Sequence, residues 1–96
     1  ELLPGMILSN EPGYYKENEY GIRTENLVVI KENNDKKLYF ENISWCPIDL
    51  DLIDINMLDQ IERHWLNKYH KKVYDTLETY LENEERDWLK YVTSKV

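Results

Sequence analysis

Two glutamates, Glu11 and Glu25, are the residues of this sequence best placed to do chemistry together. They lie fourteen positions apart, and Asn18 stands midway between them in a polar stretch, residues 16–20. An antiparallel hairpin that closes at Asn18 sets the two carboxylates across from each other. Opposed like charges destabilise a strand pair. A divalent cation between them would relieve the repulsion, because hard metals bind carboxylate oxygens. The alternative is that both side chains face water, as most glutamates do.

Two short apolar runs, residues 6–8 and 27–30, flank this stretch and predict the strands that position the glutamates. We expect the first strand at about residues 6–11 and the second at about residues 22–31. Pro12 lacks a backbone donor and Gly13 relaxes the backbone, so pairing should loosen after the first strand. Side chains alternate between the faces of a strand, which places Arg23 and Glu25 on one face of the second strand.

The rest of the chain predicts one or two further strands followed by two helices, and hence an α+β fold. A third strand is expected at residues 38–45. Apolar and acidic residues alternate at residues 48–53, as in a strand with one face in solvent. Asn56 is a good helix N-cap, with Asp59 three positions later, and an apolar residue then recurs every fourth position over about six turns. This stripe consists of Ile61, Trp65, Tyr69, Val73, Leu77 and Leu81. Asn83 is expected to cap a shorter second helix with Trp88, Leu89 and Val92 facing inward.

Composition restricts the functional class and the compartment. The formal net charge of −7 argues against nucleic-acid phosphate as a partner. No apolar run approaches the length of a membrane span, so no membrane partner is expected. The single cysteine, Cys46, excludes an internal disulfide and fits a reducing, cytoplasmic compartment, where it is expected to be a small packed residue. His64 and His70 lie six positions apart on the predicted helix, cannot share a face as metal ligands, and are expected to be structural or exposed.

The chain begins with Glu1, just before a predicted strand, and we expect it to be the C-terminal piece of a longer protein. Residues 1–54 are assigned to a larger domain and residues 55–96 to a helical extension. Eight tyrosines and three tryptophans exceed what a core of this size usually holds. Because tryptophan and tyrosine are enriched at interfaces, we expect a homodimer with the extension near the contact.

The sequence resembles the pita-bread metallopeptidases, and within them the Xaa-Pro aminopeptidases. The likeness rests on Asn-Glu-Pro-Gly-Tyr-Tyr at residues 10–15 and on Gly-Ile-Arg-Thr-Glu-Asn at residues 21–26, which look like the last two metal-ligand segments of that family. Residues 46–54 and 65–70 are similar to the C-terminal extension of the same aminopeptidases. The resemblance therefore covers nearly the whole chain.

The resemblance implies a dinuclear metal site, commonly of manganese, held by two Asp, one His and two Glu. The two Glu match Glu11 and Glu25. By this match Glu25 bridges both cations, whereas Glu11 binds one cation and handles the proton of the attacking water. Arg23 matches the family's Gly-Ile-Arg segment and would orient the carboxylates from outside the ligand shell. The two Asp and the His have no counterpart in this sequence and would lie upstream of Glu1.

The implied reaction is release of the N-terminal residue from a peptide with proline in second position. Prolidases, which cut Xaa-Pro dipeptides, share the Glu-Pro-Gly and Gly-Ile-Arg elements and remain an alternative. The helical tail favours the aminopeptidase. A non-catalytic pita-bread protein is the third possibility, against which the presence of both Glu11 and Glu25 argues. Tyr14 and Tyr15 could line a substrate pocket, although packing against the hairpin is the expected role.

Overall fold

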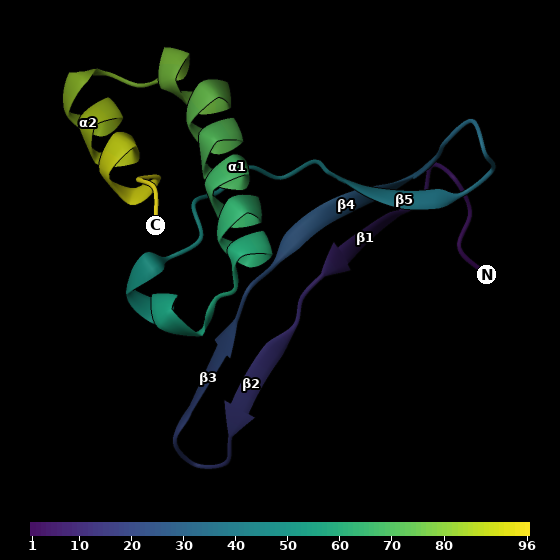
Figure 1. The fold of residues 1–96 in the computed structure, drawn as a ribbon, viewed down its shortest axis with the longest axis horizontal. Coiled ribbons are helices and arrows are strands. Elements are labelled where there is room, and N and C mark those ends of the chain that lie inside the picture. The colour runs from purple at the N-terminus through teal and green to yellow at the C-terminus, as the bar shows by residue number, and fades with distance from the viewer. The chain divides into compact units, whose positions relative to one another are not determined.

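A computed structural model describes residues 1–96, and these residues form two compact units, Glu1–Ser44 and Trp45–Val96. The first unit contains only strands and the second contains only helices and turns (Figure 1). The predicted order of antiparallel strands followed by two helices is therefore confirmed, and the fold class is α+β. None of the helices combines the length and the apolar character that crossing a membrane requires.

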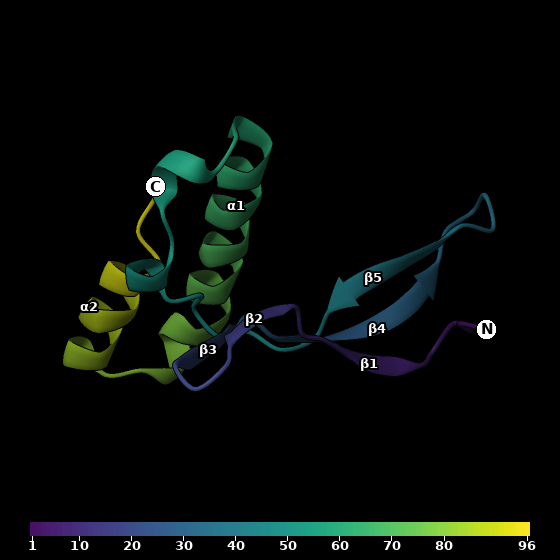
Figure 2. The ribbon, with the colours of Figure 1, turned by 90° about the horizontal axis from the view of Figure 1, so that it is seen from below.

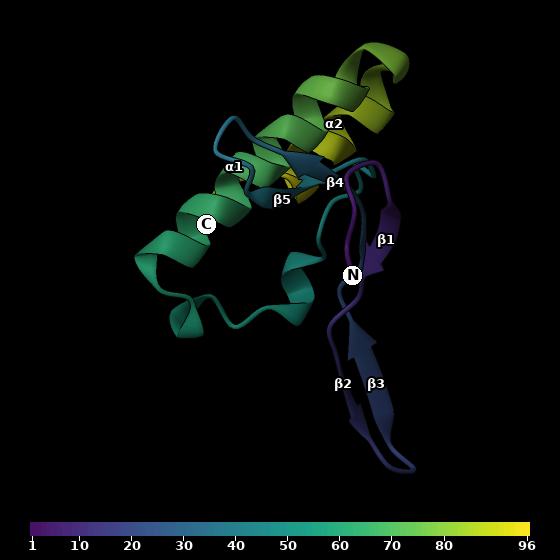
Figure 3. The ribbon, with the colours of Figure 1, turned by 90° about the vertical axis from the view of Figure 1, so that its right-hand side faces the viewer.

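The first unit holds a three-stranded antiparallel sheet and a separate two-stranded hairpin. The sheet has the strand order β1-β4-β5, which Figure 2 shows from below. The hairpin β2-β3 continues from β1 and β4 as a narrow ribbon (Figure 3). The five strands are β1 (Ile7–Asn10), β2 (Gly13–Lys16), β3 (Tyr20–Arg23), β4 (Asn26–Glu32) and β5 (Leu38–Asn42). The single long second strand expected at residues 22–31 is thus two strands.

The hairpin closes where the sequence predicted. In β2-β3, Gly13 pairs with Arg23 and Lys16 pairs with Tyr20, so each pair is equidistant from Asn18. Asn18 has a φ of 57°, a left-handed conformation that asparagine tolerates better than most residues. The pairs of the β1-β4 ladder are also equidistant from Asn18, and the last of them joins Asn10 to Asn26. One turn therefore sets the register of both ladders.

The second unit contains α1 (Gln60–Leu77) and α2 (Asn83–Val92), with short 3₁₀ turns before and after α1. Asp59 caps α1 through a reciprocal capping box with Glu62, and Glu82 caps α2 in the same way with Glu85. The predicted caps Asn56 and Asn83 are therefore wrong. Asn56 lies within a 3₁₀ turn that Asp54 caps.

The core of the second unit is formed by Tyr69, Val73 and Leu89, with Trp45 and Ile48 packed against it. Leu77, Leu81 and Val92 also contact this core. The inward positions predicted at Leu89 and Val92 are confirmed, whereas the first two residues of the helical stripe are open to solvent. Ile61 is 80% exposed, Trp65 is 50% exposed, and Trp88, predicted to face inward, is 57% exposed.

Residues 48–53 are not a strand, contrary to the expectation from their alternation. They contain a 3₁₀ turn, Leu50–Leu52, because the Asp49 carboxylate accepts a hydrogen bond from the Asp51 amide and caps the turn. Side-chain capping by aspartate offers the backbone a local alternative to a strand ladder. Cys46, expected to be packed, is exposed and has a free thiol.

Candidate metal-binding hairpin

Glu11 and Glu25 lie in the short break between the two ladders of the first unit. Glu11 follows β1 and precedes β2, whereas Glu25 follows β3 and precedes β4. The break coincides with Pro12, which has no amide hydrogen to give to a ladder. The Pro12 carbonyl still accepts a hydrogen bond from the Thr24 amide at 3.1 Å. This bond keeps the register across the break, so the two glutamates occupy opposed positions.

Opposed residues of an antiparallel pair project to the same face, and so do residues two apart on one strand. Arg23 and Glu25 show this directly, because the Arg23 Nε lies 3.3 Å from a Glu25 carboxylate oxygen. The prediction that these two residues share a face is confirmed. Both side chains remain about half exposed, so the ion pair by itself adds little stability.

The Arg23 guanidinium interacts with both glutamates. Its pKa is raised above the ordinary value, first by a side-chain hydrogen bond to Tyr15 and then by the negative charge of Glu25, with a smaller contribution from Glu11. The positive charge of Arg23 thus offsets part of the repulsion between the two carboxylates. A like-charge pair of this kind is otherwise unfavourable in a strand pair.

Tyr15 packs against the hairpin as expected, and it also makes contacts with Arg23 and two glycines that the sequence did not predict. Its ring lies over Gly13 and Gly21, so closely that a Cβ on either glycine would come within 2.7 Å of a Tyr15 atom. Both glycines therefore leave room for the ring, and the phenol oxygen can accept the hydrogen bond from Arg23. The positions of these residues could have predicted the contacts of Tyr15, because residues 13, 15, 21 and 23 fall on one face of a hairpin that closes at Asn18.

Tyr14 lies on the other face of the hairpin. Its ring centroid is 6.0 Å from that of Tyr20, and the two planes are tilted by 45°. Such an aromatic pair stabilises the hairpin by packing. Tyr14 and Tyr15 therefore both pack against the hairpin, which was their expected role.

The chemistry of the donors fits part of a divalent metal site. Two carboxylates on one face supply hard oxygen ligands, with Arg23 to orient one of them. No group of three or more His, Cys, Asp or Glu side chains in the structure is arranged to hold a metal ion. His64 is exposed on α1, and His70 is buried in the second unit, where its Nε2 accepts a hydrogen bond from the Ile48 amide. Glu11 and Glu25 would thus hold metal only together with ligands from outside this chain.

Comparisons with known proteins agree with the likeness seen in the sequence. Residues 1–32 match the metallopeptidase family M24, and residues 36–96 match the C-terminal region of peptidase M24. A probable Xaa-Pro aminopeptidase P of Coprinopsis cinerea is 44% identical over 99% of this chain. Aminopeptidase P1 of Lotus japonicus is 40% identical over 99% of the chain.

A solved structure is similar along almost the whole chain. The crystal structure of X-prolyl aminopeptidase from Caenorhabditis elegans, described as a cytosolic enzyme with a di-nuclear active site, superposes with a TM-score of 0.83. The two sequences are 30% identical, and the match covers 99% of this chain and 17% of that chain. The chain likewise spans only 16–17% of the length of the two curated relatives.

Proposed function

Because this chain belongs to the metallopeptidase family M24, we propose that it is the C-terminal part of a dinuclear metal-dependent aminopeptidase that acts on Xaa-Pro peptides. The observation that carries the proposal is the hairpin register, in which the ladders on either side of the break align Glu11 with Glu25 and Arg23 contacts Glu25. The proposal divides the chain into a catalytic part, residues 1–54, and a helical extension, residues 55–96. It places the enzyme in the cytoplasm, as the likeness to a protein described as cytosolic supports.

Each residue of the hairpin has a distinct role in this proposal. Glu25 would hold both cations, and Glu11 would hold one cation and would accept the proton of the attacking water on its carboxylate. Two divalent ions, which we propose to be Mn²⁺, would lower the pKa of a bound water and so supply a nucleophile at neutral pH. Arg23 keeps the Glu25 carboxylate oriented through the 3.3 Å contact, and Tyr15 fixes Arg23 in turn.

The substrate in this proposal is a peptide with proline in second position, cut between its first residue and the proline. The experiment compares a Xaa-Pro-Xaa tripeptide with a Xaa-Pro dipeptide, each incubated with Mn²⁺ and either the complete enzyme or the isolated 96-residue chain. We expect the complete enzyme to cleave the tripeptide and the isolated chain to cleave neither substrate. Two carboxylates cannot hold a metal pair that needs further ligands.

Each other outcome of this assay has a definite meaning. Cleavage of the dipeptide alone by the complete enzyme would identify a prolidase instead. Complete enzyme that binds Mn²⁺ at no site and cleaves neither peptide would identify a non-catalytic relative. Turnover by the isolated chain would contradict the assignment of only part of the site to these residues.

The helical extension is proposed to contribute to a homodimer. Two large aromatic side chains of α2, Trp88 and Tyr91, are 57% and 76% exposed, and aromatic residues are enriched in interface cores. Replacing both by serine is expected to halve the mass of the complete enzyme in solution, as light scattering would measure. The exposed Lys90 lies on the same helix, and Lys90→Ser is the matched control that should leave the mass unchanged. A double variant that keeps the dimer mass would refute an interface at α2.

A further inference from the structure

Two consecutive residues of α1, Tyr69 and His70, hold the same short backbone segment, residues 46–48. The Tyr69 hydroxyl donates a hydrogen bond to the Cys46 carbonyl at 2.8 Å. The Ile48 amide donates to the His70 Nε2 at 3.0 Å. Pro47, between the two anchored residues, has no amide hydrogen of its own. The segment is therefore fastened to the helix on both sides of Pro47.

The bond to Ile48 defines the protonation state of His70. A ring nitrogen that accepts a hydrogen bond carries no proton, so Nε2 is the basic nitrogen of a neutral imidazole. The side chain is completely buried, and burial lowers the pKa of His70 below its ordinary value. Its Nδ1 is also buried and has no hydrogen-bond partner. A second proton on this ring would have to be placed at Nε2, facing the Ile48 amide donor.

No charged side chain near His70 would stabilise an imidazolium, and burial is the largest influence on its pKa. The Tyr69 ring lies 5.9 Å away, and its hydroxyl is already bonded to Cys46. No charged side chain contributes to the lowered pKa, neither Asp49 and Asp51 beyond the segment nor any charged residue of α1 or α2. Lys72, two residues along α1, lies over the ring of Trp45 at 5.8 Å. A buried charge without a partner is costly, so protonation and the clamped arrangement exclude each other.

We propose that Tyr69 and His70 form a pH-dependent clamp on residues 46–48, which protonation of His70 releases. Both hydrogen bonds of the clamp are present above pH 6.5, the ordinary pKa of histidine. The bond to His70 is lost as the pH falls through the lowered pKa of His70 in the folded protein. This inference rests on the second unit alone and is independent of the proposed peptidase activity.

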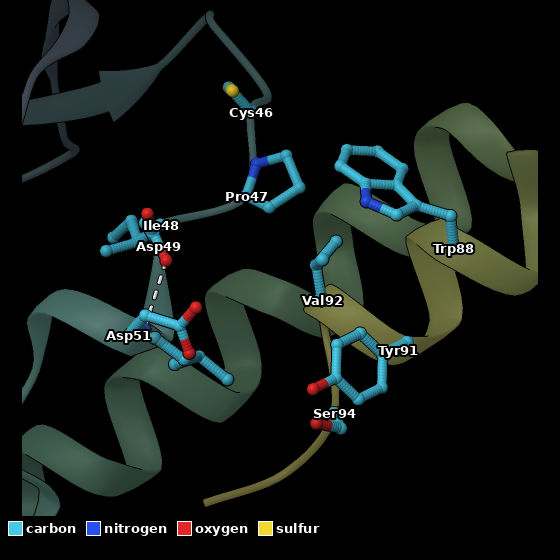
Figure 4. A pocket seen from close by; sticks show the side chains of 10 residues that line it. Cys46, Pro47, Ile48, Asp49, Asp51, Trp88, Tyr91, Val92 and Ser94 are labelled. Carbon is cyan, nitrogen blue, oxygen red and sulfur yellow. Dashed lines mark hydrogen bonds between the residues drawn. The ribbon is translucent and has the colours of Figure 1, made fainter.

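Release of the clamp also alters a cavity. Cys46, Pro47 and Ile48 form one wall of a cavity of about 430 Å³, and Trp88, Tyr91 and Val92 of α2 line the other side (Figure 4). A wall that detaches from α1 changes the shape and the access of this space. The segment therefore links the protonation of a buried group to a surface feature.

The experiment measures hydrogen–deuterium exchange of the peptide that contains Ile48, at about pH 7.5 and about pH 5, on either side of the ordinary histidine pKa. The variant His70→Gln places a carbonyl oxygen where Nε2 lies and cannot be protonated in this range. His64→Gln removes the other histidine of the chain, which is exposed on the same helix, and is the matched control. Comparison of variants at one pH cancels the chemical effect of pH on exchange.

We expect equal protection in all three proteins at the higher pH. At the lower pH the wild type and His64→Gln should exchange faster than His70→Gln, and the excess should grow by up to about tenfold for each further unit of pH, since one unit changes the ratio of protonated to neutral histidine tenfold. An equal response of the wild type and His70→Gln would overturn the proposal.

Tyr69→Phe tests the clamp without changing the histidine, and keeps the proposal testable if His70→Gln does not fold. It removes the hydroxyl that bonds to the Cys46 carbonyl and keeps the ring. Release should then begin at a higher pH than in the wild type, because protonation competes with one anchor fewer. A release pH that is unchanged or lower in Tyr69→Phe would also count against the clamp.

Discussion

Replacing Glu25 with alanine in the complete enzyme is expected to abolish binding of the metal pair and to reduce peptidase activity by far more than replacing Arg23. Glu25 is the proposed ligand of both cations, whereas Arg23 contacts its carboxylate at 3.3 Å without binding metal. Loss of such an outer partner typically costs roughly 10–100-fold in affinity or activity. Metal content by mass spectrometry and the rate on a Xaa-Pro tripeptide would measure both effects.

Glu41→Ala is the matched control for this comparison. Glu41 is an exposed glutamate on β5 of the same unit, paired with Val29 and distant in register from the break at Glu25. Its replacement should leave metal content and rate unchanged. Equal losses in the Glu25 and Arg23 variants, or metal retained by Glu25→Ala, would rule out the role given to Glu25.

Leu89→Ala should cause the largest loss of stability in the second unit, about 2–5 kcal/mol, because it removes a fully buried side chain and leaves a cavity. Leu89 is 1% exposed and belongs to the core with Tyr69 and Val73. All three tryptophans of the chain, Trp45, Trp65 and Trp88, lie in this unit, so their fluorescence during urea unfolding reports on it.

Lys90→Ala provides the comparison on the same helix. Lys90 is exposed, and substitutions at such positions usually change stability by no more than about 0.5 kcal/mol. If the two variants unfold at the same urea concentration, Leu89 is not the core residue that its burial indicates.

The local part of the candidate site could be predicted from the sequence. The register of the hairpin depends on one turn at Asn18 and on the interruption at Pro12, and both are properties of single residues and their neighbours. Once the turn is placed, the period of two determines that Glu11 opposes Glu25 and that Arg23 shares their face. The contact of Tyr15 with Gly13 and Gly21 was not predicted, because the direction of a side chain along a face depends on its rotamer.

The sequence by itself determined that two helices follow the strands, because periodicity every fourth residue defines an apolar stripe. It could not determine how much of the stripe is buried, because an apolar helix face is buried only where another part of the chain packs against it. Tyr69 and Val73 of α1 are buried because they share a core with Leu89 of α2. Ile61 lies a little over two turns before Tyr69 on α1 and remains exposed.

Only the tertiary structure decided the place of His70. The sequence did not distinguish a structural His70 from an exposed one, because a polar residue beside an apolar helical stripe fits either environment. Its burial follows from residues 46–48, which are far from it along the chain yet lie against it, with the Ile48 amide bonded to Nε2. Such a contact depends on how the chain returns to α1, and no local pattern of residues encodes that path.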